Sequence, residues 1–142
     1  MKYLLDTCVI SEMVRPQPNP QAINWLRQQS ELDLYVSVLT FGEIDKGVEK
    51  AVDPERKKKL LLWLETDLRQ RFGNRVVAID LAVATMWGRV QGVCEKKGQG
   101  MPAIDSLIAV SALVNNCTVV TRNTGDMVHS GAALFNPWQD KF

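Results

Sequence analysis

The chain has 142 residues, about the usual length of one domain, and its apolar share of 46% is that of a globular protein with one buried core. The formal net charge of +1 lacks the overall basic signature of many nucleic-acid-binding proteins. No stretch approaches the roughly 20 apolar residues that cross a bilayer, and Tyr3-Leu4-Leu5 is too short for a signal-peptide core. We therefore expect one cytoplasmic domain over residues 1–142, without a membrane segment.

The cysteines and the histidine exclude several kinds of site. Cys8, Cys94 and Cys117 are widely spaced and form no C-x-x-C pair, which argues against a zinc ribbon and a redox motif and favours three reduced thiols. His129 is the one histidine of the chain, so a multi-histidine metal site is excluded. The basic run at residues 56–59 is typical of a solvated helix face.

Short apolar runs alternate with longer helical patterns along the chain. The patterns predict strands at residues 2–5, 34–36, 75–79, 118–121 and 133–135. They predict helices at residues 7–14, 21–29, 38–51, 54–73, 81–96 and 102–115, with a turn or short helix at 123–128. Asn19 and Asp53 each precede a proline, and Asp80 precedes the helix at 81, so all three are predicted N-caps. Strands separated by helices predict an α/β fold, a parallel sheet sandwiched by helices.

Four acidic residues are predicted to meet at one edge of this sheet. In open parallel sheets, ligands bind beyond the carboxyl ends of the strands. Asp6 directly follows the first strand, and Asp126 follows the strand that ends at Thr121. Glu43 and Asp105 are expected in the first turns of helices that begin at the same edge.

Each of these carboxylates also has a purely structural interpretation. Asp6 could end a strand, and Asp126 could belong to a helix cap. Thr40-Phe41-Gly42-Glu43 matches a capping box. Asp105 would be favoured by the dipole at its helix start, although the apolar residues around it make a charge there less ordinary.

Taken together, the four carboxylates predict a metal site. They would repel one another, and a hard divalent cation such as Mg²⁺ or Mn²⁺ relieves that repulsion. Such an ion offsets phosphate charge and makes a bound water a better nucleophile. We expect Asp6 and Asp105 to bind it directly, and Glu43 and Asp126 to complete the shell, hold a second ion or orient waters. The polar neighbours that would hold the carboxylates or contact a phosphate are Thr7, Thr121 and Asn123.

Five segments resemble a known family in the right order along essentially the whole chain. They are Leu4-Leu5-Asp6-Thr7-Cys8-Val9-Ile10-Ser11-Glu12, Glu43-Ile44-Asp45-Lys46-Gly47, Pro102-Ala103-Ile104-Asp105-Ser106-Leu107-Ile108-Ala109, Thr121-Arg122-Asn123-Thr124-Gly125-Asp126 and Asn136-Pro137-Trp138. The chain thereby resembles PIN domains of the VapC toxin type, and its ending is similar to that of the FitB-like subgroup. Two positions depart from the family pattern: Cys8 stands where asparagine is usual, and Met127 where phenylalanine is usual.

The resemblance implies a PIN fold, a Mg²⁺ or Mn²⁺ site and cleavage of single-stranded RNA. It also implies a toxin of a toxin–antitoxin pair, a homodimer, and silencing by a small antitoxin that forms a hetero-oligomer with the toxin. An antitoxin arginine could pair with the carboxylates in place of metal. The apolar residues Trp25, Leu26, Phe41 and Trp63 could line a partner groove, with core packing as the alternative.

Three other functions stay open at this point. A housekeeping RNA-processing PIN nuclease would carry the same carboxylates. A phosphotransfer domain of the receiver or haloacid-dehalogenase type also places an aspartate after the first strand, but the dehalogenase pattern requires a second aspartate where this chain has Cys8. A non-catalytic binding module would not need all four carboxylates.

Overall fold

A computed structural model describes residues 1–140 of the chain. Five strands form one sheet in the order β3-β2-β1-β4-β5, and every neighbouring pair is parallel. The strands are β1 (Lys2–Leu5), β2 (Leu34–Ser37), β3 (Val76–Val77), β4 (Cys117–Val120) and β5 (Leu134–Phe135). The predicted parallel α/β sheet is therefore confirmed.

Helices connect these strands. They are α1 (Thr7–Glu12), α2 (Pro20–Gln28), α3 (Val38–Lys50), α4 (Pro54–Leu62), α5 (Arg69–Phe72), α6 (Leu81–Lys96), α7 (Ala103–Val114) and α8 (Thr124–Met127). Short 3₁₀ turns lie at Glu31–Asp33 and Val128–Ser130. The predicted caps are confirmed, because the Asn19, Asp53 and Asp80 side chains accept backbone N–H bonds at 3.0, 3.1 and 2.9 Å.

Most predicted boundaries agree with the structure to within one residue, and three predicted elements differ by more. The helix expected over residues 54–73 is interrupted by a π-helix at Trp63–Leu68. The strand expected at 75–79 is only two residues long, at a sheet edge where β2 is its one neighbour. The first helix ends at Glu12 rather than residue 14, because the N–H groups of Met13 and Val14 donate to the carbonyls three residues back, of Ile10 and Ser11, and so form a tighter turn.

Apolar side chains cover both faces of the sheet. Successive residues of a strand point to opposite faces, so Leu5 joins the core under the α1, α2 and α3 side, whereas Leu4 joins the core under α7 and α8. In β4, Val120 and Val119 divide in the same way. Helices on both sides thus leave the carboxyl ends of the strands as the edge where polar groups can gather.

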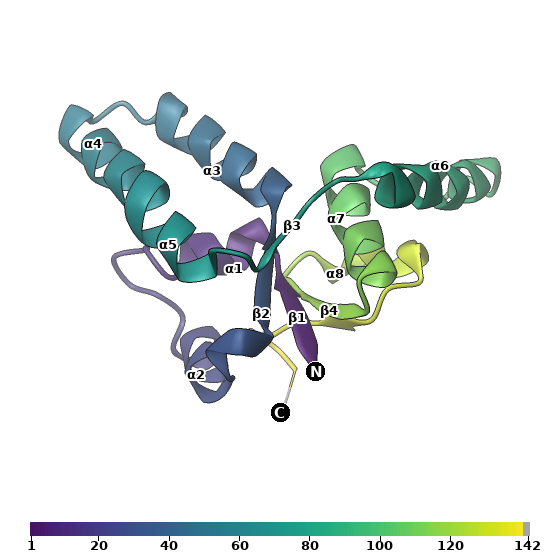
Figure 1. Cartoon of the computed structure of the whole chain (residues 1–142), viewed down its shortest axis with the longest axis horizontal. Coiled ribbons are helices and arrows are strands. Elements are labelled where there is room, and N and C mark those ends of the chain that lie inside the picture. Colours follow the sequence, from purple (N-terminus) through teal and green to yellow (C-terminus); the bar gives the residue numbers. More distant parts are fainter. Residues whose placement is uncertain (141–142) are drawn as a thin grey trace.

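The strand order places a topological switch point at the middle of the sheet. The chain runs from β1 outward to β2 and β3, then returns to β4 on the other side of β1. Ligands of doubly wound sheets bind at such a point, beyond the strand ends. In Figure 1, α3 and α7 lie on opposite sides of this edge, and the segments after β1 and β4 begin between them.

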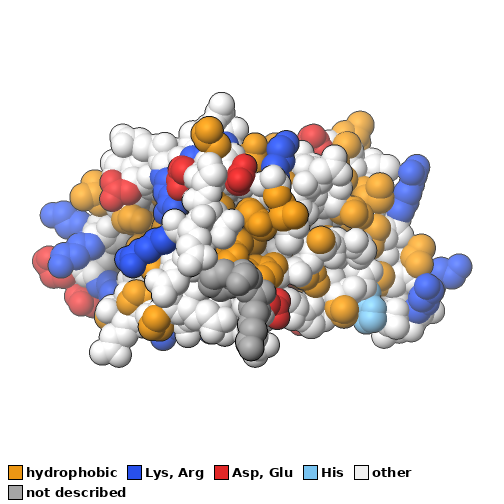
Figure 2. Space-filling view, turned by 90° about the horizontal axis from the view of Figure 1, so that it is seen from below, with side chains coloured by type: hydrophobic (Ala, Val, Ile, Leu, Met, Phe, Trp, Pro, Cys, Tyr) orange, Lys and Arg blue, Asp and Glu red, His pale blue; other side chains and the backbone are white. Residues whose placement is uncertain are grey.

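On one face of the molecule, the basic side chains do not form a single patch. On the face seen in Figure 2, Lys and Arg side chains lie mainly toward the two ends, and apolar and uncharged atoms occupy much of the middle. Over residues 1–140, no helix has the length and apolar character needed to span a membrane.

Candidate active site

Asp6 lies at the switch point, where β1 passes into α1. Its side chain is 2% exposed, and its backbone N–H continues the sheet by donating to Val120 O at 2.9 Å. The Asp6 Oδ1 atom caps α1 by accepting the Thr7 N–H at 2.8 Å. Burial raises the pKa of Asp6, and hydrogen bonds from Thr121 and Thr7 oppose that rise. Asp6 is thus both a helix cap and a buried carboxylate at the functional edge.

The segment after β4 is tied directly to Asp6. The Thr121 hydroxyl donates to Asp6 Oδ2 at 2.7 Å and accepts the Asn123 N–H at 2.9 Å. Thr121 is fully buried, whereas Asn123 is exposed and its side chain makes no capping hydrogen bond in α8. Thr121 therefore orients the carboxylate, and the Asn123 amide is left accessible at the site.

Glu43 reaches the same edge from α3, but not as the sequence predicted. The helix begins at Val38 and is capped by Ser37, whose Oγ accepts the Leu39 N–H at 3.1 Å. Glu43 therefore lies in the second turn rather than in the expected first turn. The alternative interpretation as a capping box at Thr40 is also wrong, because Thr40 is already inside the helix and fully buried. Glu43 Oε1 instead accepts a hydrogen bond of 2.6 Å from the Thr7 hydroxyl.

Asp105 and Asp126 complete the group from the other half of the sheet. Asp105 lies in the first turn of α7 and is half-buried, and Asp126 lies in α8 and is exposed. Burial, the charges of the three other carboxylates and a hydrogen bond with Asp126 raise the pKa of Asp105 to about 6. The structure thus brings all four predicted acids, Asp6, Glu43, Asp105 and Asp126, within electrostatic range of one another.

The chemistry of this group fits a hard divalent cation. All four side chains offer carboxylate oxygens, and their mutual repulsion is the energy that a bound cation relieves. Within residues 1–140, no three His, Cys, Asp or Glu side chains stand close enough to enclose an ion as they are placed. The carboxylates therefore converge without forming a closed ligand shell, an arrangement compatible with Mg²⁺, which keeps several of its waters.

The PIN domain family model matches residues 3–128. The chain belongs to this family. Toxin FitB of Neisseria gonorrhoeae is 36% identical to this PIN domain over 96% of the chain and 99% of the relative. The VapC ribonuclease Y4jK of Sinorhizobium fredii is 28% identical over 96% and 97%. The crystal structure of FitAcB from Neisseria gonorrhoeae superposes with a TM-score of 0.91 at 35% identity, covering 96% of this chain and 98% of that one.

The two residues that depart from the family pattern lie in different surroundings, Cys8 beside Asp6 and Met127 in the core. Cys8 Sγ lies 3.8 Å from Asp6 Oδ2 and 3.7 Å from Thr121 Oγ1, and it accepts the Arg122 N–H at 3.4 Å. Burial, followed by the charge of Asp6, raises the Cys8 pKa to about 11, so the side chain is a neutral thiol. Met127 is fully buried in the core under α7 and fills an apolar position.

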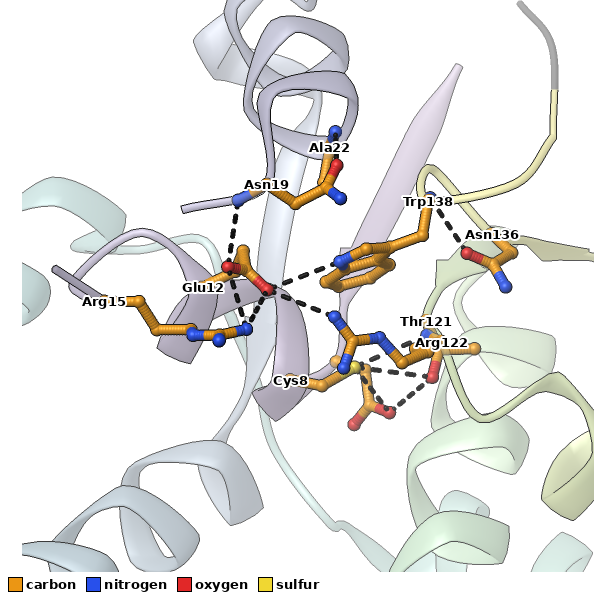
Figure 3. A network of polar contacts seen from close by, with 10 residues as sticks. Cys8, Glu12, Arg15, Asn19, Ala22, Thr121, Arg122, Asn136 and Trp138 are labelled. Atoms are coloured by element: carbon orange, nitrogen blue, oxygen red, sulfur yellow. Dashed lines mark hydrogen bonds and ion pairs between the residues drawn. The ribbon is translucent and has the colours of Figure 1, made fainter. Parts of the chain in front are cut away.

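Sequence reasoning missed a buried carboxylate, Glu12, at the end of α1. Glu12 is 2% exposed and accepts hydrogen bonds from Arg15 at 3.1 Å, Arg122 at 3.2 Å and the Asn19 N–H at 3.1 Å (Figure 3). Burial raises its pKa, but the Asn19 N–H and Arg15 outweigh this, so the pKa lies below the usual value. The available signal was its position three residues after Val9, on the helix face that enters the core.

Arg122 connects Glu12 to the end of the chain. Its guanidinium lies 4.3 Å from the Trp138 ring centroid, and the Trp138 indole N–H donates to Glu12 at 3.3 Å (Figure 3). Because Arg122 stands between Thr121 and Asn123, these contacts hold the segment that orients Asp6. Trp138 thus links the Asn136-Pro137-Trp138 ending to the site.

The four apolar residues expected to line a partner groove divide into two pairs. Trp25 and Leu26 are buried in the core, and the Trp25 ring packs against Tyr3 and Phe135 with centroids 5.0 and 5.2 Å apart. Core packing is therefore the correct interpretation for that pair. Phe41 and Trp63 are only partly buried, and each lines a surface hollow.

Proposed function

We propose that this PIN domain is a metal-dependent endoribonuclease and the toxin of a toxin–antitoxin pair. The observation that carries the proposal is the convergence of four carboxylates at the switch point, where burial and the charges of the other three acids raise the pKa of Asp105 to about 6. Such a group suits a phosphodiesterase, because a divalent cation bound there offsets the charge of a phosphate. The relatives named as a toxin and as a ribonuclease support the same function.

The ion in this proposal is Mg²⁺ or Mn²⁺, held by Asp6 and Asp105 with Glu43 and Asp126 as further ligands. When bound, such an ion polarises a phosphoryl oxygen and lowers the pKa of a coordinated water. Thr121 and Thr7 hold Asp6 and Glu43 with hydrogen bonds of 2.7 and 2.6 Å, which fixes the direction of their free oxygens. Asn123 is exposed, and its backbone N–H is bonded to the Thr121 hydroxyl that holds Asp6, so in this proposal its side chain contacts the RNA phosphate.

Cleavage of a single-stranded RNA by the purified chain tests this assignment. The parent is expected to cleave with Mg²⁺ or Mn²⁺ and to stop when the metal is chelated. Asp6→Asn should lower the cleavage rate by at least about 100-fold, because the ligand charge is lost while the cap acceptor of α1 stays. Asp45→Asn, an exposed acid on α3 outside the cluster, is the matched control and should cleave like the parent. An Asp6→Asn protein that cleaves at the parent rate would contradict the proposal.

The proposed partner is a cognate antitoxin that binds a homodimer of this chain in the cytoplasm. The physical reason for this interaction is charge, because an antitoxin arginine can pair with the carboxylates that hold the metal. Expression alone should be poorly tolerated by cells, and co-expression with the neighbouring gene should yield a complex with little ribonuclease activity. A harmless, active enzyme without a partner in its native cells would instead indicate a housekeeping RNA-processing nuclease.

A further inference from the structure

A groove leads away from the carboxylates between α1, α3 and α4. Thr7 and Glu43, which belong to the proposed catalytic site, line it together with Arg56, Leu60 and Trp63. A second hollow continues it past Lys59 and shares Val14, Arg56, Leu60 and Trp63 with the first. We call this continuous feature the α4 groove. Anything held by Thr7 and Glu43 is therefore next to a surface with an aromatic ring and cationic side chains.

The donors of the α4 groove are largely unused. Within residues 1–140, Arg56, Lys59 and the Trp63 indole make no hydrogen bond or ion pair, and Arg56 and Lys59 are exposed. Arg15, at the α1 wall, is already paired with Glu12 at 3.1 Å. Two acids, Asp53 and Glu55, also line the second hollow. Asp53 caps α4 through a 3.1 Å bond from the Glu55 N–H, and the Glu55 side chain is exposed. The free cationic groups are thus those of α4.

Trp63 is a fixed platform in this groove. It packs against the core beside Leu60 and is only partly buried, so part of the indole remains at the surface. It is also the first residue of the π-helix, and π-helical turns often occur at functional sites. A partly exposed indole that shares a groove with unpaired cations is a combination with which proteins bind single-stranded nucleic acid.

We propose that the α4 groove binds the RNA nucleotides next to the cleaved bond, with a base stacked on Trp63 and a phosphate on Arg56. This inference rests on the proposed function, because an RNA strand whose phosphate lies at the carboxylates must continue along an adjoining surface. Stacking on an indole requires an unpaired base, so the groove selects single-stranded RNA. Arg56 supplies the charge that complements the adjacent phosphate, and Lys59 extends that contact along the strand.

Binding of a fluorescent single-stranded RNA to the Asp6→Asn protein tests the proposal without cleavage. Trp63→Leu should weaken binding about 10-fold, and Trp63→Phe should recover part of the loss because a ring remains. Arg56→Gln should reduce the slope of log K against log salt by about 0.7, the value for one phosphate contact on a single strand. Lys58→Gln, an exposed lysine on the same helix outside the groove, is the control and should bind like the parent.

Steady-state cleavage with the intact carboxylates gives a second measurement. Trp63→Leu and Arg56→Gln should raise KM several-fold and leave kcat within about two-fold, because the contact is made equally before and during the reaction. Unchanged KM and RNA affinity in both variants would overturn the groove proposal while parent cleavage still upheld the proposed function. Variants that keep RNA affinity but lose inhibition by the antitoxin would overturn it in favour of a protein-binding groove. A parent protein that neither binds nor cleaves RNA would overturn both proposals.

Discussion

At the scale of single residues, Asp105 makes the stability of the metal-free protein depend on pH. Its pKa is raised from 3.8 to about 6, so the folded state holds this proton more tightly than the unfolded state does. The contribution of Asp105 therefore favours the fold below about pH 4 and is lost as the pH rises to about 6. Bound metal would offset this loss, because it stabilises the charged form.

Replacing Asp105 by asparagine should remove the loss of stability that the charged Asp105 side chain causes above about pH 6. At pH 7.5 in the presence of chelator, we expect Asp105→Asn to unfold about 3 °C above the parent, equivalent to about 1 kcal/mol after allowance for solvent screening. The difference should shrink as the pH falls toward 4, where the parent side chain is neutral. Melting curves of both proteins at pH 4.5 and 7.5 measure it, and a constant difference across this range would show that the carboxylates do not interact as described.

Glu12 is the residue whose loss should cost the most stability near the site. Glu12→Ala removes the acceptor for the Asn19 N–H and the Trp138 indole N–H, so we expect a loss of about 2–3 kcal/mol in the free energy of unfolding. Glu12→Gln keeps an acceptor oxygen and should cost less. Because the pKa of Glu12 is lowered by folding, its contribution is present at neutral pH and is lost as the pH falls below about 4.5.

A double-mutant cycle between Glu12 and Arg122 tests whether the two act together. Denaturant unfolding of Glu12→Gln, Arg122→Gln and the double variant should give a coupling energy of at least about 0.5 kcal/mol. Arg27→Gln, an exposed change on α2 outside the network, supplies a control expected to be additive with Glu12→Gln. Additivity of Glu12 and Arg122 as well would mean that their 3.2 Å contact contributes nothing measurable.

At the scale of elements, local sequence signals predicted most of the helices. They missed the cap of α3 and the π-helix that interrupts the segment at residues 54–73. Asp80 and the 16-residue pattern after it predicted α6 correctly at both ends, because cap and periodicity agree there. At α3, the sequence pattern suggested a cap at Thr40, whereas the structure uses Ser37, because β2 ends at Ser37 and the helix begins at the next residue, Val38. The π-helix escaped prediction because the apolar positions of the segment also fit an uninterrupted helix.

The cap of α3 gives a prediction at this scale. Ser37→Ala should lower stability by about 1 kcal/mol, because the Leu39 N–H loses its acceptor. Ser37→Asn offers another capping oxygen for the same N–H and should recover part of the loss where the buried position admits it. Thermal unfolding measures the effect. A loss of stability in a variant at Thr40 would not indicate a capping role for Thr40. Its hydroxyl accepts a hydrogen bond of 3.1 Å from the Thr7 hydroxyl, and loss of that contact would account for the effect.

At the scale of the whole molecule, the sequence predicted that the four carboxylates lie at one edge of the sheet. It did not predict the side-chain contacts of Glu12 that hold the neighbouring segments. The rule that parallel strands end at one edge is general, and it placed Asp6 and Asp126 together from the sequence. In the Glu12 network, Glu12 contacts Arg122 and Trp138, which are 110 and 126 residues away in the sequence. No local sequence pattern predicts such pairs. Long-range side-chain pairs of this kind are fixed by packing, which only the structure shows.

The metal is expected to hold the two halves of the molecule together. Asp6 and Glu43 come from the β1–α1 junction and α3, whereas Asp105 and Asp126 come from α7 and α8 across the switch point. A cation that binds only this folded arrangement stabilises it by about 2.7 kcal/mol at one hundred times its dissociation constant. We therefore expect the melting temperature to rise by about 8 °C with Mn²⁺ or Mg²⁺ at that concentration.

The comparison that decides this prediction uses the double variant Asp6→Asn, Asp105→Asn. One ligand is then lost from each half, so the added metal should shift its melting temperature by no more than about 2 °C. Asp45→Asn is the control for a general loss of surface charge and should keep the full shift. Equal shifts in all three proteins would place the ion elsewhere on the molecule. A shift that survives in the double variant but disappears with Glu43→Gln and Asp126→Asn would instead make Glu43 and Asp126 the principal ligands.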